Sequence, residues 1–422
     1  MKTIKILICG GIQENFMNQL TSGIKQFSNS KYSFDILYKD KINEKLYKNI
    51  DHFINASIKT SFFKKISVFF VLLFTRNTFF ELFLDFKVRN LRKIVIPFIF
   101  FKERIKAKIF ADFLAKKNYD ILHFQYLYKE LYLQYLPKTQ KIVCSIWGSD
   151  LYRRSGLSMT YYQSKILNRA TRISIHSIEM REVLLAKFGR HLAEKVFIAL
   201  FPPYENLFKQ IKENQSNTGL TNRFKEKYHI NRNKIVVAIG HNAKEENRHI
   251  KVVHEIAKLN KSIKSKIVCI FQLTYGSYNK EKYAQKINNI CKENNIEAIT
   301  FLEYLTTKEL AALRLVSDIL IHTPVTDAMS GFATEAMYAG NLLITGAWLP
   351  YGTFKRAGLK YMEIENIKEI SSLLSNIVSN GIDKYKLNIR QQQKAIEQTF
   401  FPEPTSKMWI RLYNEVLNIE KN

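Results

Sequence analysis

Short apolar runs alternate with helical stretches along this chain, and one passage in its second half limits the possible folds most. Residues 318–323 form an apolar run typical of a buried strand. From Ser330 the apolar residues recur at helical spacing, and Gly340 is well suited to end that helix. Residues 342–345 begin another apolar strand. The passage predicts one unit of an open α/β sheet, in which ligands bind beyond the carboxyl ends of the strands.

Two carboxylates lie close to the loop of this unit. Asp327 precedes the expected helix. Glu335 lies eight residues after Asp327, within that helix. The helix start itself holds Ser330, Gly331 and Phe332, where free backbone N–H groups can bind an anion. The helix dipole alone would also favour a carboxylate here. A ligand-binding role and a structural role are therefore both open for Glu335.

The same alternation recurs in both halves of the chain. Further apolar runs that fit buried strands span residues 4–9, 34–38, 119–126, 141–146, 172–177, 196–201, 234–239, 266–273 and 298–302. A chain of 422 residues exceeds one ordinary core, so two domains are expected. Strands that alternate with helices predict two doubly wound, Rossmann-like parallel sheets.

The pair Pro202-Pro203 separates the two halves. Residues 1–203 are expected to form the first domain and residues 204–395 the second, with the polar stretch to about Asn222 as a linker. Residues 396–422 end in a helix with apolar side chains that need a surface to cover them. We therefore expect this last segment to cross back to the N-terminal domain.

Glycine turns follow the first strand of each half. Gly10 and Gly11 let the backbone approach a ligand closely, but they belong to no complete G-x-G-x-x-G motif and are weak as a fingerprint. Gly240 opens a longer polar turn. The residues of that turn able to bind phosphate are His241, Asn242, Lys244 and Arg248, while a capping role is equally open for His249.

Composition narrows the possible partners. The formal charge of +28, from 65 basic and 37 acidic residues, attracts nucleic acid, anionic lipid or phosphorylated small molecules. The sequence has no recognition-helix, zinc or stacking-sheet motif, which disfavours nucleic acid. Four scattered cysteines without metal-ligand spacing are typical of core residues in a reducing compartment, and we expect no metal site. The N-terminal apolar run is too short for a signal peptide, so we expect a cytoplasmic protein.

Residues from about 60 to 115 are unusually rich in aromatic and basic side chains. Each apolar run there is shorter than the roughly 20 residues that a membrane-spanning helix needs. Aromatic and basic residues together favour a segment that lies on an anionic membrane surface. The alternative is a helical insertion that packs on its own domain and exposes a solvated basic face.

The motif Asp327-x7-Glu335-Ala-Met-Tyr-Ala-Gly340 resembles the Glu-x7-Glu motif and trailing Ala-Met-x-x-Gly of family 4-like GT-B glycosyltransferases (glycosyl transferases group 1), with Asp replacing the first Glu. Residues 147–150 are similar to the His-Gly-x-Asp turn of that group, with Trp147 replacing His. Residues 240–249 and 273–276 look more like bacterial transferases that add acetamido-fucose to a lipid-linked oligosaccharide. The resemblance covers most of the chain after about residue 119 and is thin over residues 40–115.

This resemblance implies a GT-B fold, in which two Rossmann-like domains face a central cleft. The second domain would bind the nucleoside diphosphate sugar, with Glu335 on the ribose, Asp327 on the donor sugar and Tyr304 near the nucleobase. The diphosphate would rest on the Gly240 turn without metal. In the first domain, Asp150 or His123 would orient or deprotonate the acceptor hydroxyl. A role as a helix N-cap is equally open for Asp150.

We therefore expect a hexosyltransferase-type enzyme that moves a sugar from a nucleoside diphosphate donor to a glycan or polyprenyl-diphosphate-linked acceptor. Its expected setting is the inner face of the cell membrane, in bacterial surface polysaccharide or glycoconjugate assembly. No cofactor besides the donor substrate is expected. Two alternatives remain open: a catalytically inactive GT-B scaffold that binds a partner or lipid and, more remotely, a nucleic-acid-binding protein.

Overall fold

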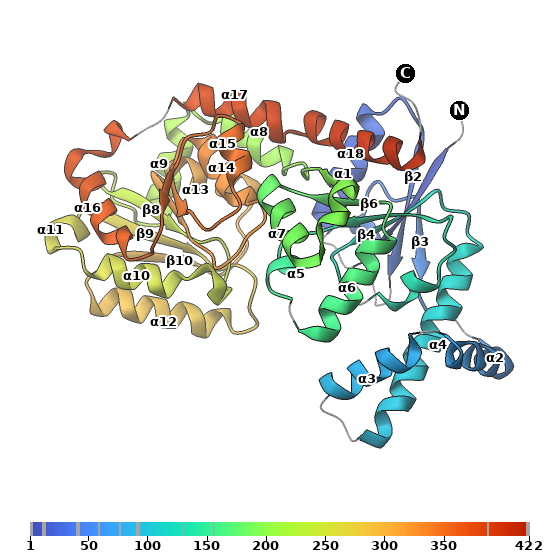
Figure 1. Cartoon of the computed structure of the whole chain (residues 1–422). Coiled ribbons are helices and arrows are strands. Elements are labelled where there is room, and N and C mark those ends of the chain that lie inside the picture. The colour runs from blue at the N-terminus through green and yellow to red at the C-terminus, as the bar shows by residue number, and fades with distance from the viewer. Residues whose placement is uncertain are drawn as a thin grey trace. The chain divides into compact units, whose positions relative to one another are not determined.

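The alternating strands and helices form parallel sheets in both halves of the chain. The computed structural model describes residues 3–10, 14–38, 43–57, 60–75, 77–89, 93–128, 130–154, 156–385 and 388–418. The chain divides into two units: Met1–Pro202 with Pro402–Asn422, and Pro203–Phe401 (Figure 1). Each unit holds one parallel sheet flanked by helices, which confirms the predicted α/β class.

The sheet of the first unit has the strand order β3-β2-β1-β4-β5-β6-β7, and all its pairs are parallel. Its strands are β1 (Ile4–Cys9), β2 (Tyr32–Tyr38), β3 (His52–Asn55), β4 (Ile121–Gln125), β5 (Lys141–Ser145), β6 (Arg172–Ile175) and β7 (Val196–Ile198). The order reverses between β1 and β4. Ligands bind at such a switch point in open α/β sheets, and Gly10 follows β1 there.

Helices cover this first sheet. They include α1 (Glu14–Phe27), α5 (Ser149–Tyr152), α6 (Leu157–Arg169) and α7 (Ile178–Phe188), with a 3-10 turn η3 (Leu131–Tyr135). The last helix, α18 (Pro402–Leu417), packs against α1. Its Trp409 is fully buried and donates its indole N–H to the carbonyl of Leu200 at 2.8 Å. The final segment of the chain thus completes the core of the first unit.

Three helices between β3 and β4 extend away from the first sheet and form what we call the helical module (Figure 1). They are α2 (Phe62–Leu73), α3 (Thr78–Val88) and α4 (Ile96–Ala115). Ser61 caps α2 by accepting a hydrogen bond from the backbone of Lys64. Among the described residues, no single helix is long and apolar enough to cross a membrane. The helices α2 and α3 have sufficient length and apolar character only when taken together, and the chain bends by 95° between them.

The sheet of the second unit has the order β10-β9-β8-β11-β12-β13, again wholly parallel. Its strands are β8 (Ile235–Ile239), β9 (Ile267–Gln272), β10 (Ala298–Phe301), β11 (Ile319–His322), β12 (Leu342–Gly346) and β13 (Met362–Ile364). The order reverses between β8 and β11. The predicted strand, loop, helix and strand passage is therefore β11, α14 (Gly331–Ala339) and β12.

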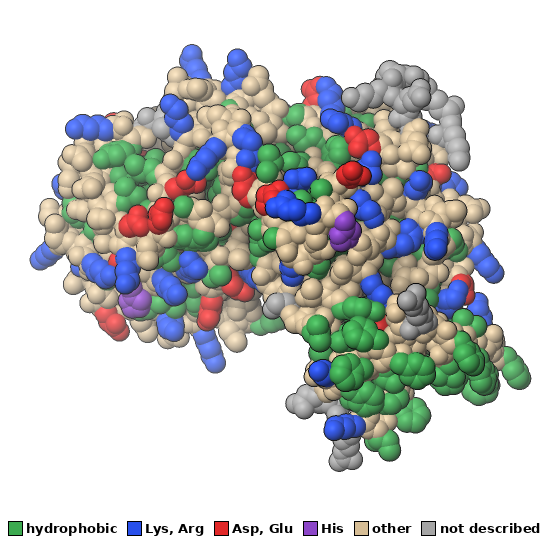
Figure 2. Space-filling model, in the orientation of Figure 1, with side chains coloured by type: hydrophobic (Ala, Val, Ile, Leu, Met, Phe, Trp, Pro, Cys, Tyr) green, Lys and Arg blue, Asp and Glu red, His purple; other side chains and the backbone are tan. Residues whose placement is uncertain are grey.

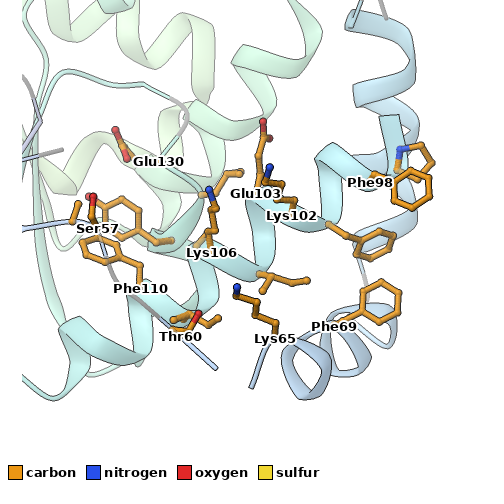
Figure 3. Close-up of a pocket in the computed structure, with 18 residues that line it drawn as sticks. Ser57, Thr60, Lys65, Phe69, Phe98, Lys102, Glu103, Lys106, Phe110 and Glu130 are labelled. Atoms are coloured by element: carbon orange, nitrogen blue, oxygen red, sulfur yellow. The ribbon is translucent and has the colours of Figure 1, made fainter. Parts of the chain in front are cut away.

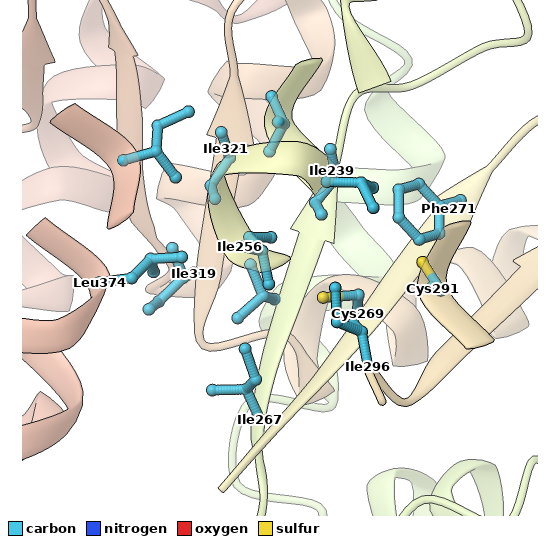
Figure 4. Packing of buried hydrophobic residues seen from close by; sticks show 14 of the residues in the cluster. Ile239, Ile256, Ile267, Cys269, Phe271, Cys291, Ile296, Ile319, Ile321 and Leu374 are labelled. Atoms are coloured by element: carbon cyan, nitrogen blue, oxygen red, sulfur yellow. The ribbon is translucent and has the colours of Figure 1, made fainter. Parts of the chain in front are cut away.

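The core of this second sheet consists mainly of aliphatic side chains. Figure 4 shows Ile239, Ile267 and Ile319 from the strands packed with Ile256 and Leu374 from the covering helices. The helices of the unit are α8 (Glu205–Glu213), α9 (Thr218–Lys227), α10 (His249–Ala257), α11 (Lys261–Lys264), α12 (Lys280–Glu293), α13 (Thr307–Val316), α14, α15 (Gly352–Arg356), α16 (Glu369–Asn380) and α17 (Ile389–Phe400).

The prediction of a linker from Pro203 to about Asn222 is wrong, because most of this stretch is helical. Residues 205–213 and 218–227 are the helices α8 and α9, which pack against α13. Leu207, Phe208 and Ile211 lie on one face of α8 and are fully buried, so its polar residues occupy only the outer face. The stretch is part of the second unit rather than a free connection.

Candidate functional site

The loop after β11 places Asp327 among aromatic rings. One carboxylate oxygen of Asp327 accepts the hydroxyl of Tyr351 at 2.7 Å and lies 3.3 Å from Nε2 of His322. The other oxygen accepts the backbone N–H of Ala328 at 2.8 Å. Burial alone would raise the pKa of Asp327, but the bonds from His322 and Tyr351 outweigh it and lower the pKa to about 2. Asp327 is therefore a fixed anion at the carboxyl end of the sheet.

Glu335 on α14 is held by a guanidinium from the neighbouring helix α13. Nε and Nη2 of Arg314 donate to the same oxygen, Oε2 of Glu335, at 3.0 and 2.9 Å. Arg314 also donates to the side chain of Gln272 at the end of β9. Oε1 of Glu335 forms no hydrogen bond with a described residue, so it is free to accept one from a ligand hydroxyl.

The turn after β8 is packed so tightly that it requires glycine. Gly240 has a φ of 58°, and a Cβ there would lie 2.2 Å from Nε2 of His249. His249 begins α10 and is fully buried, with Nδ1 3.2 Å from the hydroxyl of Tyr283. Its Nε2 has no hydrogen-bond partner among the described residues. This close packing against Gly240 and Tyr283 favours a structural role for His249.

A continuous chain of contacts joins this turn to both carboxylates. The ring of His241 stacks on Phe332 at 5.6 Å and lies 5.4 Å from the ring of His322. The guanidinium of Arg314 lies 4.2 Å from the centroid of the same Phe332 ring. The structure thus brings together the predicted residues His241, Phe332, Glu335 and Asp327 at the carboxyl ends of β8 and β11.

Cations and a helix start border this cluster. Lys244 is exposed, and Arg248, whose φ is 61°, precedes α10 and lies over the ring of Trp348. The side chain of Asn242 holds the turn by accepting the backbone N–H of Lys244 at 2.9 Å. These residues form a basic polar turn beside the carboxylates.

At the start of α14, Ser330 caps the helix by accepting the N–H of Ala333 at 3.1 Å. A Cβ at Gly331 would meet no atom within 4 Å, so the space over this helix start is open. An open helix start with unsatisfied N–H groups is suited to bind an anion.

Two tyrosines follow the neighbouring strands β9 and β10. The rings of Tyr275 and Tyr304 are nearly parallel, with centroids 6.2 Å apart and an angle of 8° between their planes. Tyr304 is 74% exposed. The pair offers a flat aromatic surface at the edge of the site, and such surfaces stack well on planar rings.

In the first unit, the switch point is closed tightly around Gly10. Its φ is 104°, and a Cβ there would come within 2.4 Å of the carbonyl oxygen of Gln125. Glycine is therefore required by the approach of β4, whether or not a ligand binds. Gly11 lies outside the described residues.

The two expected acceptor-side groups are both enclosed. His123 has no exposed surface; its Nε2 lies 2.6 Å from the hydroxyl of Ser145 and its Nδ1 2.7 Å from that of Tyr413. Burial lowers the pKa of His123 to about 3, so the ring is neutral. Asp150 is also fully buried and accepts backbone N–H groups from Leu127 and Trp147. In this geometry His123 joins β5 to α18, Asp150 holds the loops after β4 and β5, and neither side chain reaches the surface.

An aromatic cluster lies at the same end of the first sheet. Trp147 donates its indole N–H to Gln125 at 2.9 Å, stacks on Phe201 at 4.2 Å and lies nearly parallel to Tyr126 at 5.4 Å. Tyr126 has a φ of 67°, an uncommon conformation for a bulky residue. Trp147 and Tyr126 are both half-buried and form a second flat surface.

Several of these contact residues were not predicted from the sequence. Arg314, Tyr351, Tyr275 and Tyr126 each reach a predicted residue from a separate element. Arg314 could have been found from the sequence, because it is the one charged residue in the apolar run 310–316. A cation in such a run indicates a buried partner of opposite charge. Among the described residues, no group of three His, Cys, Asp or Glu side chains could hold a metal ion.

Known proteins resemble this chain in sequence over one segment and in fold along its whole length. Residues 71–177 match the sequence profile of the family described as Glycosyl transferase 4-like. That match begins inside the segment where the resemblance is thin, so the helices α3 and α4 belong to the matched region. No curated protein matches the sequence.

Solved structures match along the whole chain. A glycosyltransferase from Rickettsia africae has a TM-score of 0.70 at 13% identity, with all of both chains covered. Sucrose-phosphate synthase from Thermosynechococcus elongatus has a TM-score of 0.63 at 12% identity, covering 99% of this chain and 100% of that one. Anabaena HepE in complex with UDP and glucose has a TM-score of 0.61 at 11% identity, covering 97% and 98%. The chain therefore has the GT-B fold.

Proposed function

We propose that this protein is a metal-independent glycosyltransferase that moves a sugar from a nucleoside diphosphate donor to a glycan or lipid-linked acceptor. Support comes from the GT-B fold and from the match of residues 71–177 to the glycosyl transferase 4-like family. The observation that carries the proposal is the cluster in the second unit. There, Arg314 fixes Glu335 while one oxygen of that carboxylate stays free.

Each part of the cluster fits one part of the donor. The free oxygen of Glu335 would accept a ribose hydroxyl, and the fixed anion of Asp327 would accept a hydroxyl of the transferred sugar. The stacked rings of Tyr275 and Tyr304 would support the nucleobase. The aromatic pair Trp147 and Tyr126 in the other unit would face an acceptor sugar, since aromatic faces pack well on sugar C–H groups.

Bond breaking needs stabilisation of the diphosphate leaving group. Negative charge grows on the diphosphate as the glycosidic bond breaks. The open start of α14 at Gly331 would supply backbone N–H dipoles, and Lys244 and Arg248 would supply positive charge. Since dipoles and cations act together here, no metal ion is required.

The setting is also part of the proposal. The basic and aromatic helical module would hold the enzyme at the inner face of a bacterial membrane, where a polyprenyl-diphosphate-linked acceptor resides. From the sequence resemblance of residues 240–249 and 273–276 alone, we infer a role in surface polysaccharide or glycoconjugate assembly. In this setting the protein is peripheral and cytoplasmic.

A panel of nucleoside diphosphate sugars, incubated with the protein and a membrane extract, tests the activity directly. Release of nucleoside diphosphate that depends on one donor is expected. Saturable nucleotide binding without turnover would favour an inactive scaffold. The absence of both nucleotide binding and turnover would refute the donor site.

The variant Glu335→Gln keeps the size of the side chain but weakens its acceptor strength. We expect it to lose most of the thermal stabilisation that the nucleotide confers. Glu297→Gln, an exposed carboxylate paired with Lys234 in the same unit, is the matched control and should keep the full shift. Equal shifts in both variants would show that Glu335 does not contact the nucleotide.

A further inference from the structure

The helical module exposes an apolar face that its own unit does not cover. Six side chains of this face expose more than two-thirds of their surface: Phe62, Phe63, Phe74, Phe79, Ile94 and Phe98. Figure 2 shows hydrophobic side chains gathered over α2, α3 and α4. Soluble chains rarely expose so large a contiguous patch unless it binds another surface.

A buried ionic cluster holds this face in place. Arg104 on α4 is fully buried and donates to Glu81 on α3 at 2.8 Å, and it also donates to the hydroxyl of Tyr162 on α6. Lys165 on α6 pairs with the other oxygen of Glu81 at 2.5 Å. These bonds tie α3 and α4 to the body of the unit, and α2 packs on α4 through Val68, Leu72 and Ile109, so the aromatic face is a fixed surface.

A large pocket opens behind the same face. Its volume is about 1120 Å³, above the roughly 300–1,000 Å³ of most small-ligand pockets. The walls of the pocket are mainly apolar. Their larger side chains include Phe69, Phe98, Phe101 and Phe110. Because Phe98 lines the pocket and also belongs to the exposed face, the two surfaces are continuous. A long apolar chain fits this space better than a single polar sugar.

Three lysines also line the pocket, and they supply charge. Figure 3 shows Lys65, Lys102 and Lys106 between Phe110 at one end and Phe69 and Phe98 at the other. None of the three lysines forms an ion pair with a described residue. They favour a ligand that carries an anionic group on an apolar chain.

Two carboxylates line the pocket as well. Glu103 is paired with Arg89 at 2.6 Å, which offsets its charge, and Glu130 has its own interactions within the fold. The lysines therefore dominate the charge of the lining.

We propose that this pocket takes one hydrocarbon chain of a phosphate-headed membrane lipid, whose phosphate is bound by Lys65, Lys102 and Lys106. The aromatic face then lies in the surface of the same membrane and delivers the lipid to the pocket. This inference deepens the membrane part of the proposed function and rests on it.

Photocrosslinking locates the lipid chain directly. The full-length protein is mixed with phosphatidylcholine vesicles that contain a phosphatidate with a photoactivatable group on its acyl chain, and crosslinked peptides are mapped by mass spectrometry. Crosslinks to pocket residues such as Phe101 and Ile105 are expected. Crosslinks confined to outward residues such as Phe63 and Phe74 would mean surface adsorption only and would overturn the proposal, as would no crosslinks at all.

Charge-matched variants test the phosphate site. Replacing Lys65, Lys102 and Lys106 together by Gln should lower the crosslinking yield by roughly tenfold or more. The control replaces three exposed lysines of the same region that do not line the pocket, Lys64, Lys93 and Lys116, and should stay within about twofold of the unchanged protein. Equal losses in both variants would show that only the overall charge attracts the lipid.

Two further measurements separate this inference from its rivals. The pocket variant should keep its nucleotide-dependent thermal shift, because the donor site lies in the other unit. If the unchanged protein shows no such shift but is still crosslinked by the lipid, the donor site is refuted and the lipid site stands. Sedimentation without lipid tests a second copy as the occupant. A stable dimer that prevents crosslinking would overturn the lipid proposal.

Discussion

The helical module and the sheet of the second unit place the same kinds of residue in opposite positions. In the sheet, Phe271 is fully buried, and the carboxylates Asp327 and Glu335 beyond the strand ends are only partly buried. In the module, Phe63 is 82% exposed, while Arg104 is fully buried and Glu81 nearly so. The sheet stabilises itself with apolar contacts and keeps its polar groups for a ligand. The module adds buried ion pairs to a small apolar core around Val68, Leu72 and Ile109, and it leaves many of its aromatic groups exposed.

This difference teaches that hydrophobic content alone does not identify a core. Both regions read as apolar in sequence, yet the module buries Phe100 and Phe110 and exposes many of its other aromatic side chains. A buried ion pair is weak evidence of extra stability, but it fixes one arrangement of the helices because removal of one partner is costly. The module therefore combines a fixed shape with an exposed apolar surface.

The largest effect is expected from breaking the ionic core of the module. Arg104→Met leaves Glu81 buried with only Lys165 as its cation, and loss of one partner of a buried pair costs roughly 3–5 kcal/mol. Denaturant unfolding of the first unit measures this loss. Lys108→Met removes a partly exposed pair with Asp112 on the same helix and should cost less than about 1 kcal/mol.

A similar loss is expected from the aromatic core of the second unit. Phe271→Ala removes a fully buried ring and should lower the free energy of unfolding by roughly 3–5 kcal/mol. The same change at the exposed Phe63 should stay within about 0.5 kcal/mol. Equal costs at the two positions would mean that the module's outer face is covered in solution.

Acid should weaken the second unit through the fully buried His249 and the half-buried His241. Burial lowers the pKa of His241 and of His249 to about 3, whereas an unfolded histidine binds its proton near pH 6.5. The unfolded state then binds more protons between these values, so stability is present above about pH 6.5 and falls as pH decreases. At pH 5 each histidine should cost about 2 kcal/mol relative to pH 7.

Urea unfolding of His249→Gln over this pH range measures the contribution of one such ring. The variant should show a shallower pH dependence than the unchanged protein. His254 is exposed on the same helix, and His254→Gln should leave the slope unaltered. An unchanged slope in both variants would place the acid sensitivity elsewhere.

The smallest effect on stability, and a large effect on binding, is expected from the exposed face. Phe63→Ser with Phe74→Ser should leave the unfolding midpoint nearly unchanged, because both rings are mostly exposed. Sedimentation with anionic vesicles should fall several-fold, since less apolar surface enters the membrane. Full sedimentation of the double variant would show that charge alone holds the protein to the vesicles.

The sheets were largely predictable from the sequence because their strands are buried on both faces and read as continuous apolar runs. Most strands lie where such runs were found, including β8, β9, β11 and β12. The edge strands β3 and β13 were missed, since they are short and only partly buried. The helix α8 was taken for a linker because its apolar residues occupy one narrow face.

The site was predictable only where its residues are close in sequence. Asp327, Ser330 and Glu335 follow one another along a single loop and helix, so their proximity could be inferred. The partners of those residues could not, because Arg314 and Tyr351 come from other elements and only the fold brings them near. The surroundings of His123 could not be inferred for the same reason: the hydroxyl of Tyr413 that encloses it comes from a helix 290 residues away.

The contact of α18 with the first unit sets an order of events during synthesis. The second unit is one continuous segment, residues 203–401, and its core needs no later residues. The first unit cannot bury Trp409 or close around His123 until the last helix has left the ribosome. The N-terminal half, although made first, is therefore completed last, at a time when the second unit is already free to fold.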